Sequence, residues 1–170
     1  MSLTSKQIIE LLDLKKHSTC GFVSETYRSK QQIPKEALPP GYDGPRALGS
    51  VLYFMVTPEA QIVLHRIRAD QMYHHYLGDP LEVLLLYPDG TGRVTIVGSN
   101  LERGMRPQLF IPGSTFHTSR LPPGGSYSLL GTSEWGGVEP SDVEIGNPEK
   151  LIRTYPAFAE QIRSFTGNLS

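Results

Sequence analysis

Residues 70–86 read DQMYHHYLGDPLEVLLL, and this stretch decides how the rest of the chain is interpreted. It begins with a polar cluster rich in tyrosine and histidine, and a Gly-Asp-Pro turn signal follows at 78–80. Residues 81–86 are then apolar on both alternating faces, apart from Glu82. A short strand with two apolar faces belongs between two buried surfaces. We therefore expect the histidine cluster to lie at the entrance to the best-buried strand, where a ligand site is first sought.

The composition is that of an ordinary globular protein. The chain has 170 residues, which suits one domain over 1–170, and its 17 glycines and 14 prolines favour many turns and short strands. A net charge of −1 without a basic stripe gives no support for nucleic-acid binding, and no apolar run approaches the roughly 18 residues of a membrane span. Cys20 is the only cysteine, which excludes an internal disulfide. With no secretory segment at the N-terminus, we expect a cytoplasmic protein.

Helices are expected only at the two ends of the chain. The capping-box spacing of Thr4 and Gln7 predicts an N-terminal helix over residues 5–16. An Asn-Pro pair at 147–148 signals a helix start, and residues 147–166 are expected to be helical, with a final helix from about residue 157. Residues 32–45 are rich in proline and glycine, which indicates a long surface loop, either a flap over the site or an arm that reaches a partner.

The segment between these ends, residues 22–145, is predicted to be β structure. Strands are predicted at 22–28, 48–56, 61–67, 81–86, 93–97, 108–111, 115–119 and 127–130. In the first of them, alternation puts Val23, Glu25 and Tyr27 on one face. Short strands without intervening helices predict a mainly β protein, an antiparallel double-sheet jelly-roll β-barrel with short N- and C-terminal helices.

Several stretches together resemble the cupin superfamily, and within it the small uncharacterised proteins of the cupin-5 type. These stretches are 21–27, 50–54, 65–66, 70–74, 78–82, 107–113 and 128–131. The resemblance implies a jelly-roll barrel, usually dimeric, with a ligand pocket inside it. It implies no single reaction, because cupins include epimerases, isomerases, dioxygenases and binding proteins.

The sequence departs from the resembling proteins at the positions of metal ligands. Gln71 and Tyr73 stand where the subfamily usually has Glu and Trp, and Tyr76 stands where metal-binding cupins need a second histidine. The second metal motif keeps its spacing, since His117 follows Pro112 by five residues.

We therefore expect no cofactor in this protein. If a divalent metal is bound, His74 and His117 are the expected ligands, with His65 as a further candidate, because neutral imidazole is a common metal ligand. The structural alternative is that these histidines are hydrogen-bonded inside a polar pocket.

Acid–base chemistry is the main alternative to metal chemistry. A partly buried histidine suits a general base, so His74 or His117 is the predicted base, and a tyrosine such as Tyr73 is the predicted acid. Candidate ligand-binding residues are Glu25, Tyr27, His65, Arg66, Gln71, Gln108 and Trp135. His65 and Arg66 are adjacent in a strand and point to opposite faces, so only one of them can enter the pocket.

Three functions remain open, and the sequence does not decide whether the protein is an enzyme. The first is a metal-independent isomerase or epimerase acting on a small polar or sugar-like metabolite. The second is a non-catalytic small-ligand-binding protein, and the third is a metal-dependent cupin oxygenase. A homodimer is expected, because exposed strand edges and the 32–45 loop offer a means of pairing.

Overall fold

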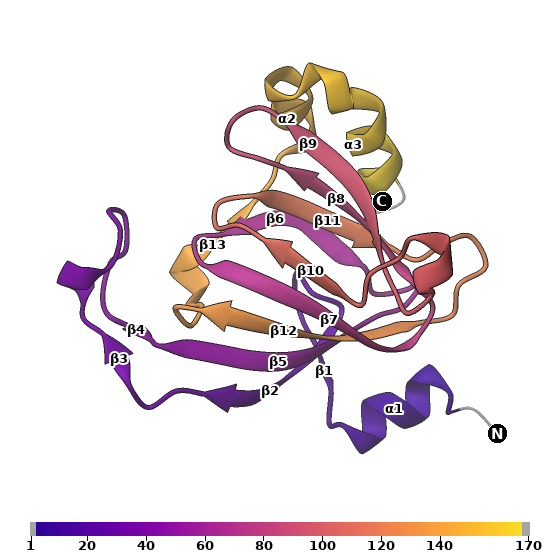
Figure 1. The fold of residues 1–170 in the computed structure, drawn as a ribbon, viewed down its shortest axis with the longest axis horizontal. Coiled ribbons are helices and arrows are strands. Elements are labelled where there is room, and N and C mark those ends of the chain that lie inside the picture. The colour runs from indigo at the N-terminus through magenta and orange to yellow at the C-terminus, as the bar shows by residue number, and fades with distance from the viewer. Residues whose placement is uncertain (1–2, 168–170) are drawn as a thin grey trace.

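Two antiparallel sheets face one another and form the body of the molecule in the computed structural model, which describes residues 3–167 (Figure 1). One sheet has the order β1 (Lys15–Lys16), β2 (Phe22–Arg28), β5 (Gly49–Val56), β12 (Ser128–Trp135), β7 (Asp70–Gly78) and β10 (Gln108–Ile111). The other has the order β13 (Val143–Ile145), β6 (Ile62–Ile67), β11 (Phe116–Arg120), β8 (Leu81–Leu86) and β9 (Gly92–Val97). The two sheets remain separate in their hydrogen bonding. The predicted mainly β, double-sheet jelly-roll architecture is confirmed.

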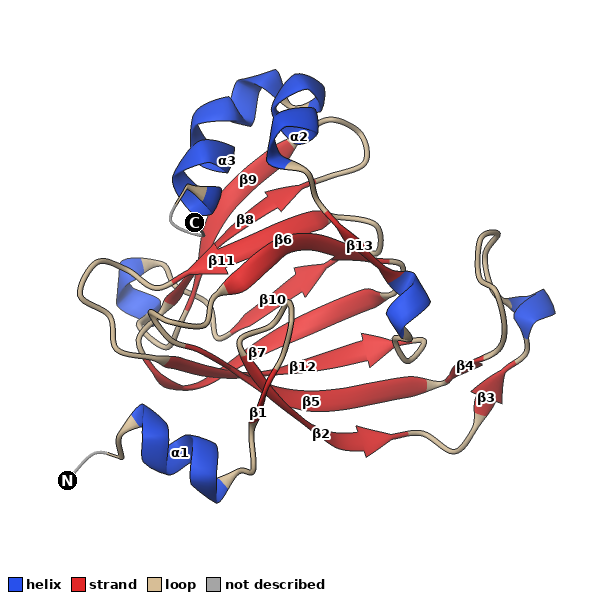
Figure 2. Cartoon of the chain, turned by 180° about the vertical axis from the view of Figure 1, so that it is seen from behind, coloured by secondary structure: helices blue, strands red, loops and turns tan. Residues whose placement is uncertain are grey.

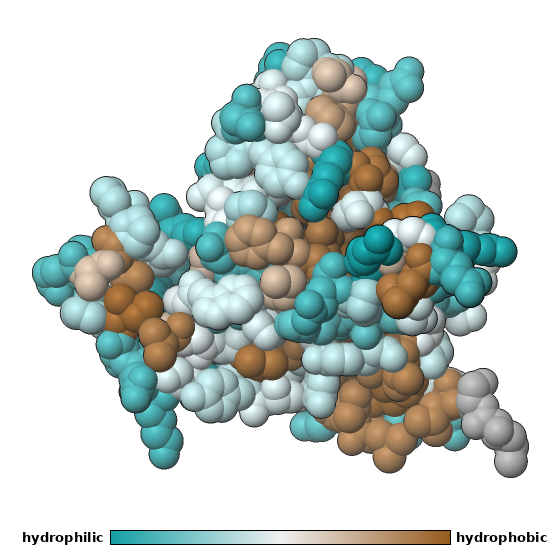
Figure 3. Space-filling view, viewed as in Figure 1, coloured by the Kyte–Doolittle hydropathy of each residue, from teal (hydrophilic) through white to brown (hydrophobic). Residues whose placement is uncertain are grey.

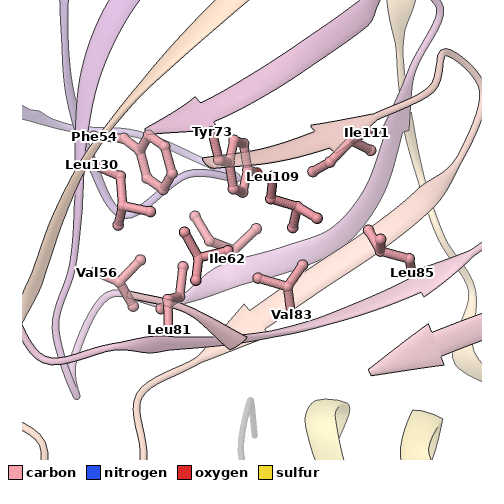
Figure 4. Close-up of a cluster of buried hydrophobic side chains, with 11 residues drawn as sticks. Phe54, Val56, Ile62, Tyr73, Leu81, Val83, Leu85, Leu109, Ile111 and Leu130 are labelled. Atoms are coloured by element: carbon pink, nitrogen blue, oxygen red, sulfur yellow. The ribbon is translucent and has the colours of Figure 1, made fainter. Parts of the chain in front are cut away.

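Strand β8 is buried on both faces, as its sequence predicts. Leu81, Val83 and Leu85 enter the cluster between the two sheets, where they meet side chains of the opposite sheet (Figure 4). The alternate residues Leu84 and Leu86 belong to a second cluster on the outer side of their sheet. Helices α2 (Pro148–Thr154) and α3 (Ala159–Thr166) cover that outer side (Figure 1). Each leucine buried in this way contributes about 1.5–3 kcal/mol of transfer free energy.

The N-terminal helix is shorter than predicted. The Thr4 capping box is present, but α1 spans Ser5–Leu11 and not residues 5–16. Asp13 has a positive φ of 51°, which ends the helical path, and residues 15–16 then pair with β2 as strand β1. Leu14 still packs with the helix against the outer face of the six-stranded sheet. In the space-filling view, apolar residues gather over α1 (Figure 3).

The C-terminal helical segment begins where the sequence predicts. The Asn147 side chain accepts a hydrogen bond from the backbone amide of Lys150, and Pro148 occupies the first turn of α2. A one-turn 3-10 helix, η4 (Pro156–Phe158), separates α2 from α3, so the segment bends around the sheet and does not run straight. None of the described helices is long and apolar enough to cross a membrane.

Residues 32–47 form an arm that projects beyond the ends of the two sheets (Figure 2). The arm holds a two-stranded ladder of β3 (Gln32–Ile33) and β4 (Arg46–Ala47), with a short helix η1 (Lys35–Ala37). Its base is fixed by the buried side chain of Arg46, which donates to both carboxylate oxygens of Asp142 at 2.6 and 2.8 Å. No residue of the arm lines the interior cavity described below, so the structure does not place it as a flap over that site. That the arm reaches a second subunit stays a prediction.

Candidate functional site

A cavity of about 600 Å³ lies between the two sheets. Strands β2, β5, β7 and β12 form one wall, and β6 and β13 form the opposite wall. The apolar part of the lining includes Leu52, Phe54 and Ile67. The polar part of the inner lining consists of His65, Gln71, Tyr73, Thr132 and Glu134. This combination of apolar walls with a few polar groups is typical of small-molecule sites.

Strand alternation explains which side chains enter the cavity. Gln71 and Tyr73 lie two residues apart on β7 and both face inward. On the neighbouring strand β12, Glu134 pairs in register with Gln71, and Thr132 pairs with Tyr73. The four side chains therefore form one polar patch on the six-stranded sheet, with the hydroxyl of Thr132 donating to the Gln71 amide oxygen at 3.5 Å.

Two histidines meet on adjacent strands of the opposite sheet. His65 on β6 and His117 on β11 are register partners, and their ring centroids lie 4.4 Å apart. Each Nδ1 atom lies close to the backbone carbonyl two residues earlier, that of Val63 at 2.7 Å and that of Thr115 at 3.1 Å. A carbonyl oxygen only accepts, so both Nδ1 atoms carry the proton and both Nε2 atoms are acceptors.

The two Nε2 atoms have different surroundings. The Nε2 atom of His117 accepts a hydrogen bond from the Gln71 amide nitrogen at 3.3 Å, and its ring lies behind the cavity lining with no exposed surface. The Nε2 atom of His65 has no hydrogen-bond partner among residues 3–167, and this ring does line the cavity. His65 thus presents a free acceptor to whatever occupies the space.

Burial sets the protonation of the groups around the cavity. It lowers the pKa of His117 from 6.5 to about 3 and also lowers the pKa of His65, so both rings are neutral near pH 7. Burial raises the pKa of the Tyr73 hydroxyl, which therefore keeps its proton. Burial also raises the pKa of Glu134, opposed by the Ser50 hydroxyl, which donates to its Oε2 atom at 2.5 Å.

Cys20 also lines the cavity, as a protonated thiol. Burial raises the pKa of its thiol to about 11, so it carries no thiolate at neutral pH.

An ion-pair cluster holds the outer part of the cavity wall. The Nε and Nη2 atoms of Arg28 donate to the Glu25 carboxylate, with a shortest distance of 2.7 Å. Its Nη1 atom donates to Glu139 at 3.0 Å, and its Nη2 atom donates to the carbonyl oxygen of Val138 at 3.2 Å. The cluster ties β2 to the segment that follows β12. Glu25, a predicted ligand-binding residue, lines the cavity. The sequence analysis gave no role to Arg28, whose position depends on this long-range pairing.

The structure places His74 and Gln108 outside the cavity, although both were predicted to be site residues. His74 follows Tyr73 in β7 and so faces the outer side of the six-stranded sheet. There its ring lies between the Ser133 hydroxyl, at 3.1 Å from Nε2, and the Gln108 amide nitrogen, at 3.2 Å from Nδ1. The expectation that His74 and His117 converge is therefore wrong, because the sheet lies between them.

Three further predicted ligand contacts also lie outside the cavity. Tyr27 is 59% exposed, because an irregularity between Glu25 and Tyr27 shifts the register and turns the tyrosine outward. Trp135 is 53% exposed, since its neighbour on β12 takes the inward position. Arg66 pairs with Glu144 on the outer surface, as alternation requires once His65 points inward.

The described residues do not fit a divalent metal site. Within residues 3–167, no group of three or more His, Cys, Asp or Glu side chains is arranged to hold a metal ion. His65 and His117 are close together, but the polar side chain that contacts this pair is Gln71, whose amide nitrogen donates to the His117 Nε2 atom. An amide is a weak metal ligand, so these three side chains do not form a metal site.

Comparisons with known proteins agree with this architecture. Structures of a hypothetical protein from Leishmania major and a protein from Shewanella oneidensis superpose with TM-scores of 0.85 and 0.82, at 27% and 26% identity. Each comparison covers 96% of this chain and 98% of the other. A Bacillus subtilis oxalate decarboxylase variant has a TM-score of 0.50 at 11% identity, covering 88% of this chain and 36% of the enzyme, which shows a shared fold alone.

The sequence comparisons lead to the same group of proteins. The uncharacterized protein YML079W of Saccharomyces cerevisiae is 28% identical over 123 residues, which are 69% of this chain and 61% of the yeast protein. The chain thus spans about three fifths of the length of this relative. Residues 6–146 match the family Cupin_5, described as Cupin superfamily (DUF985). This match covers most of the chain, and the chain therefore belongs to the Cupin_5 family of the cupin superfamily.

Proposed function

We propose that this cupin encloses a small polar molecule in the cavity between its sheets and transfers a proton on it without a metal. The observation that carries the proposal is the free Nε2 atom of His65, a buried neutral imidazole that faces a cavity of about 600 Å³. Tyr73 on the opposite sheet is the matching acid, because it keeps its proton. His65 thus replaces His74 and His117 as the proposed base.

Two walls that carry a base and an acid suit isomerisation or epimerisation. The Nε2 atom of His65 takes a proton from a carbon of the bound molecule, and the Tyr73 hydroxyl delivers a proton from the other side. The composition of the molecule is unchanged, and exchange with solvent returns the imidazole and the phenol to their starting states. The Gln71 amide, held by His117 and Thr132, provides a fixed polar group beside this path.

Solvent-isotope exchange tests the proposal without requiring the net reaction to be known. A metabolite library is screened by thermal shift, and each stabilising compound is then incubated with the protein in D₂O and analysed by mass spectrometry. We expect deuterium incorporation with the wild type and its loss in His65→Gln and Tyr73→Phe.

His74→Gln is the matched control, because it removes an imidazole from the outer face of the same region. It is expected to keep both binding and exchange. Equal exchange in His65→Gln contradicts the assigned base. Saturable binding with no exchange in the wild type favours the second candidate function, a non-catalytic ligand-binding protein, which the same cavity also supports.

A further inference from the structure

The charges that line the cavity are unbalanced. Its lining contains three glutamates, Glu25, Glu134 and Glu139, but only one arginine, Arg28, and no lysine. Arg28 is already bound to Glu25, to Glu139 and to a backbone carbonyl oxygen. An anionic ligand would have to displace two carboxylates to reach this guanidinium. The cavity therefore offers no free positive charge to a ligand.

The inner wall also has an excess of hydrogen-bond acceptors. His65 is only 3% exposed, and its Nε2 atom is an acceptor without a partner among the described residues. Glu134 is only 8% exposed, and its one side-chain donor is the Ser50 hydroxyl. The amide nitrogen of Gln71 donates one of its two N–H groups to the Nε2 atom of His117, which leaves one N–H for another acceptor. On the inner wall, the remaining side-chain donors are the Tyr73 hydroxyl and this second N–H of Gln71.

We propose that the cavity selects molecules that carry an ammonium group, with the Glu134 carboxylate as counter-ion and the His65 Nε2 atom as a further acceptor. An ammonium group has three donors and no acceptor, which complements this wall. A charge-assisted hydrogen bond to a buried carboxylate is stronger than a neutral one. The apolar lining around Leu52 and Phe54 accommodates the carbon skeleton. This inference rests on the proposed function and names the substrate class of the same site.

The test uses three probes of nearly the same shape: benzylamine, benzyl alcohol and benzoate. At pH 7 they carry a positive charge, no charge and a negative charge. Dissociation constants are measured by NMR titration of isotope-labelled protein, with the amides of β7 and β12 reporting on the cavity. We expect benzylamine to bind about tenfold or more tightly than benzyl alcohol, and benzoate to bind most weakly.

Glu134→Gln is expected to remove the preference for benzylamine over benzyl alcohol. Glu144→Gln is the matched control, because it removes the same charge from an exposed carboxylate that pairs with Arg66 outside the cavity. It is expected to keep the wild-type order of affinities. If Glu134→Gln does not fold, the affinities of the three probes for the wild-type protein still test whether the cavity prefers an ammonium group.

The outcomes separate this inference from the proposed function. Equal binding of the three probes at the cavity amides, or tighter binding of benzoate, overturns the ammonium selectivity and leaves an enclosed ligand site intact. A wild-type preference that persists in Glu134→Gln overturns the role of this carboxylate. No shift of the cavity amides with any probe overturns the inference and counts against the enclosed ligand site as well.

Discussion

Acid should destabilise this protein through His117 in particular. In the folded state, burial lowers the pKa of this imidazole from 6.5 to about 3. The unfolded chain takes up the proton at the ordinary pKa, whereas the folded protein does not. The contribution of His117 to stability is therefore complete above pH 6.5 and is lost as the pH falls toward 3, where both states are protonated.

The size of the effect follows from the separation of the two pKa values. Each pH unit between them changes the free energy of unfolding by about 1.4 kcal/mol. Between pH 7 and pH 5, His117 therefore removes about 2 kcal/mol of stability. This is a large fraction of the 5–15 kcal/mol that typically separates folded from unfolded domains, so urea denaturation resolves it readily.

The assay compares urea unfolding of the wild type and His117→Gln at pH 7, 6 and 5. The glutamine variant is expected to be less stable at pH 7, because it loses the paired ring, but its stability should fall by about 2 kcal/mol less between pH 7 and pH 5. A proton NMR titration of the imidazole in the folded protein provides the direct check. Parallel pH dependence of the two proteins, or protonation of the folded ring near pH 6, refutes the reasoning.

Three further substitutions test the packing around the site, each by urea unfolding at pH 7. Asp142→Asn is expected to cost about 3 kcal/mol, because it leaves the buried Arg46 without its main counter-charge; a loss below about 1 kcal/mol contradicts this. Gly21→Ala is expected to lower the free energy of unfolding by about 2 kcal/mol or more. The backbone of residue 21 has a φ of 67°, and an added Cβ lies 2.2 Å from the carbonyl oxygen of Met55. A variant with wild-type stability contradicts this close approach. Arg66→Ala should cost about 1 kcal/mol or less, because its ion pair lies on the surface, and a much larger loss shows that the pair is more important than its exposure indicates.

The fold was predictable from local patterns. Residues 81–86 are apolar on both faces, and the structure buries one face against the opposite sheet and the other against a covering layer of helices. The caps at Thr4 and Asn147 were readable because each depends on residues within one helical turn. The early end of α1 was not readable, since the apolar spacing continues through Leu14, which packs in the same cluster from outside the helix.

The sequence alone did not determine which side chains line the cavity. Gln71 and Tyr73 do line the cavity, but the sequence did not show that residues 70–78 form a strand, and so it did not show which side chains alternate inward. His74 was predicted as a base because imidazole suits that role, but its ring faces the outer side of the sheet. The ring of His65 lines the cavity. In β2, the irregularity before Tyr27 reverses the side that simple alternation predicts. Such irregularities depend on pairing with a distant strand and leave no local signal.

The hydrogen bonds from the Nδ1 atoms of His65 and His117 have an evolutionary consequence. In both cases the acceptor is a main-chain carbonyl oxygen, so no substitution of a partner side chain can remove it. Mutations around the cavity can therefore change its size, charge and ligand, while the same ring nitrogen continues to face inward. A protein built in this way can acquire new ligands through substitutions of neighbouring residues without losing the tautomer on which the proposed acid–base chemistry depends.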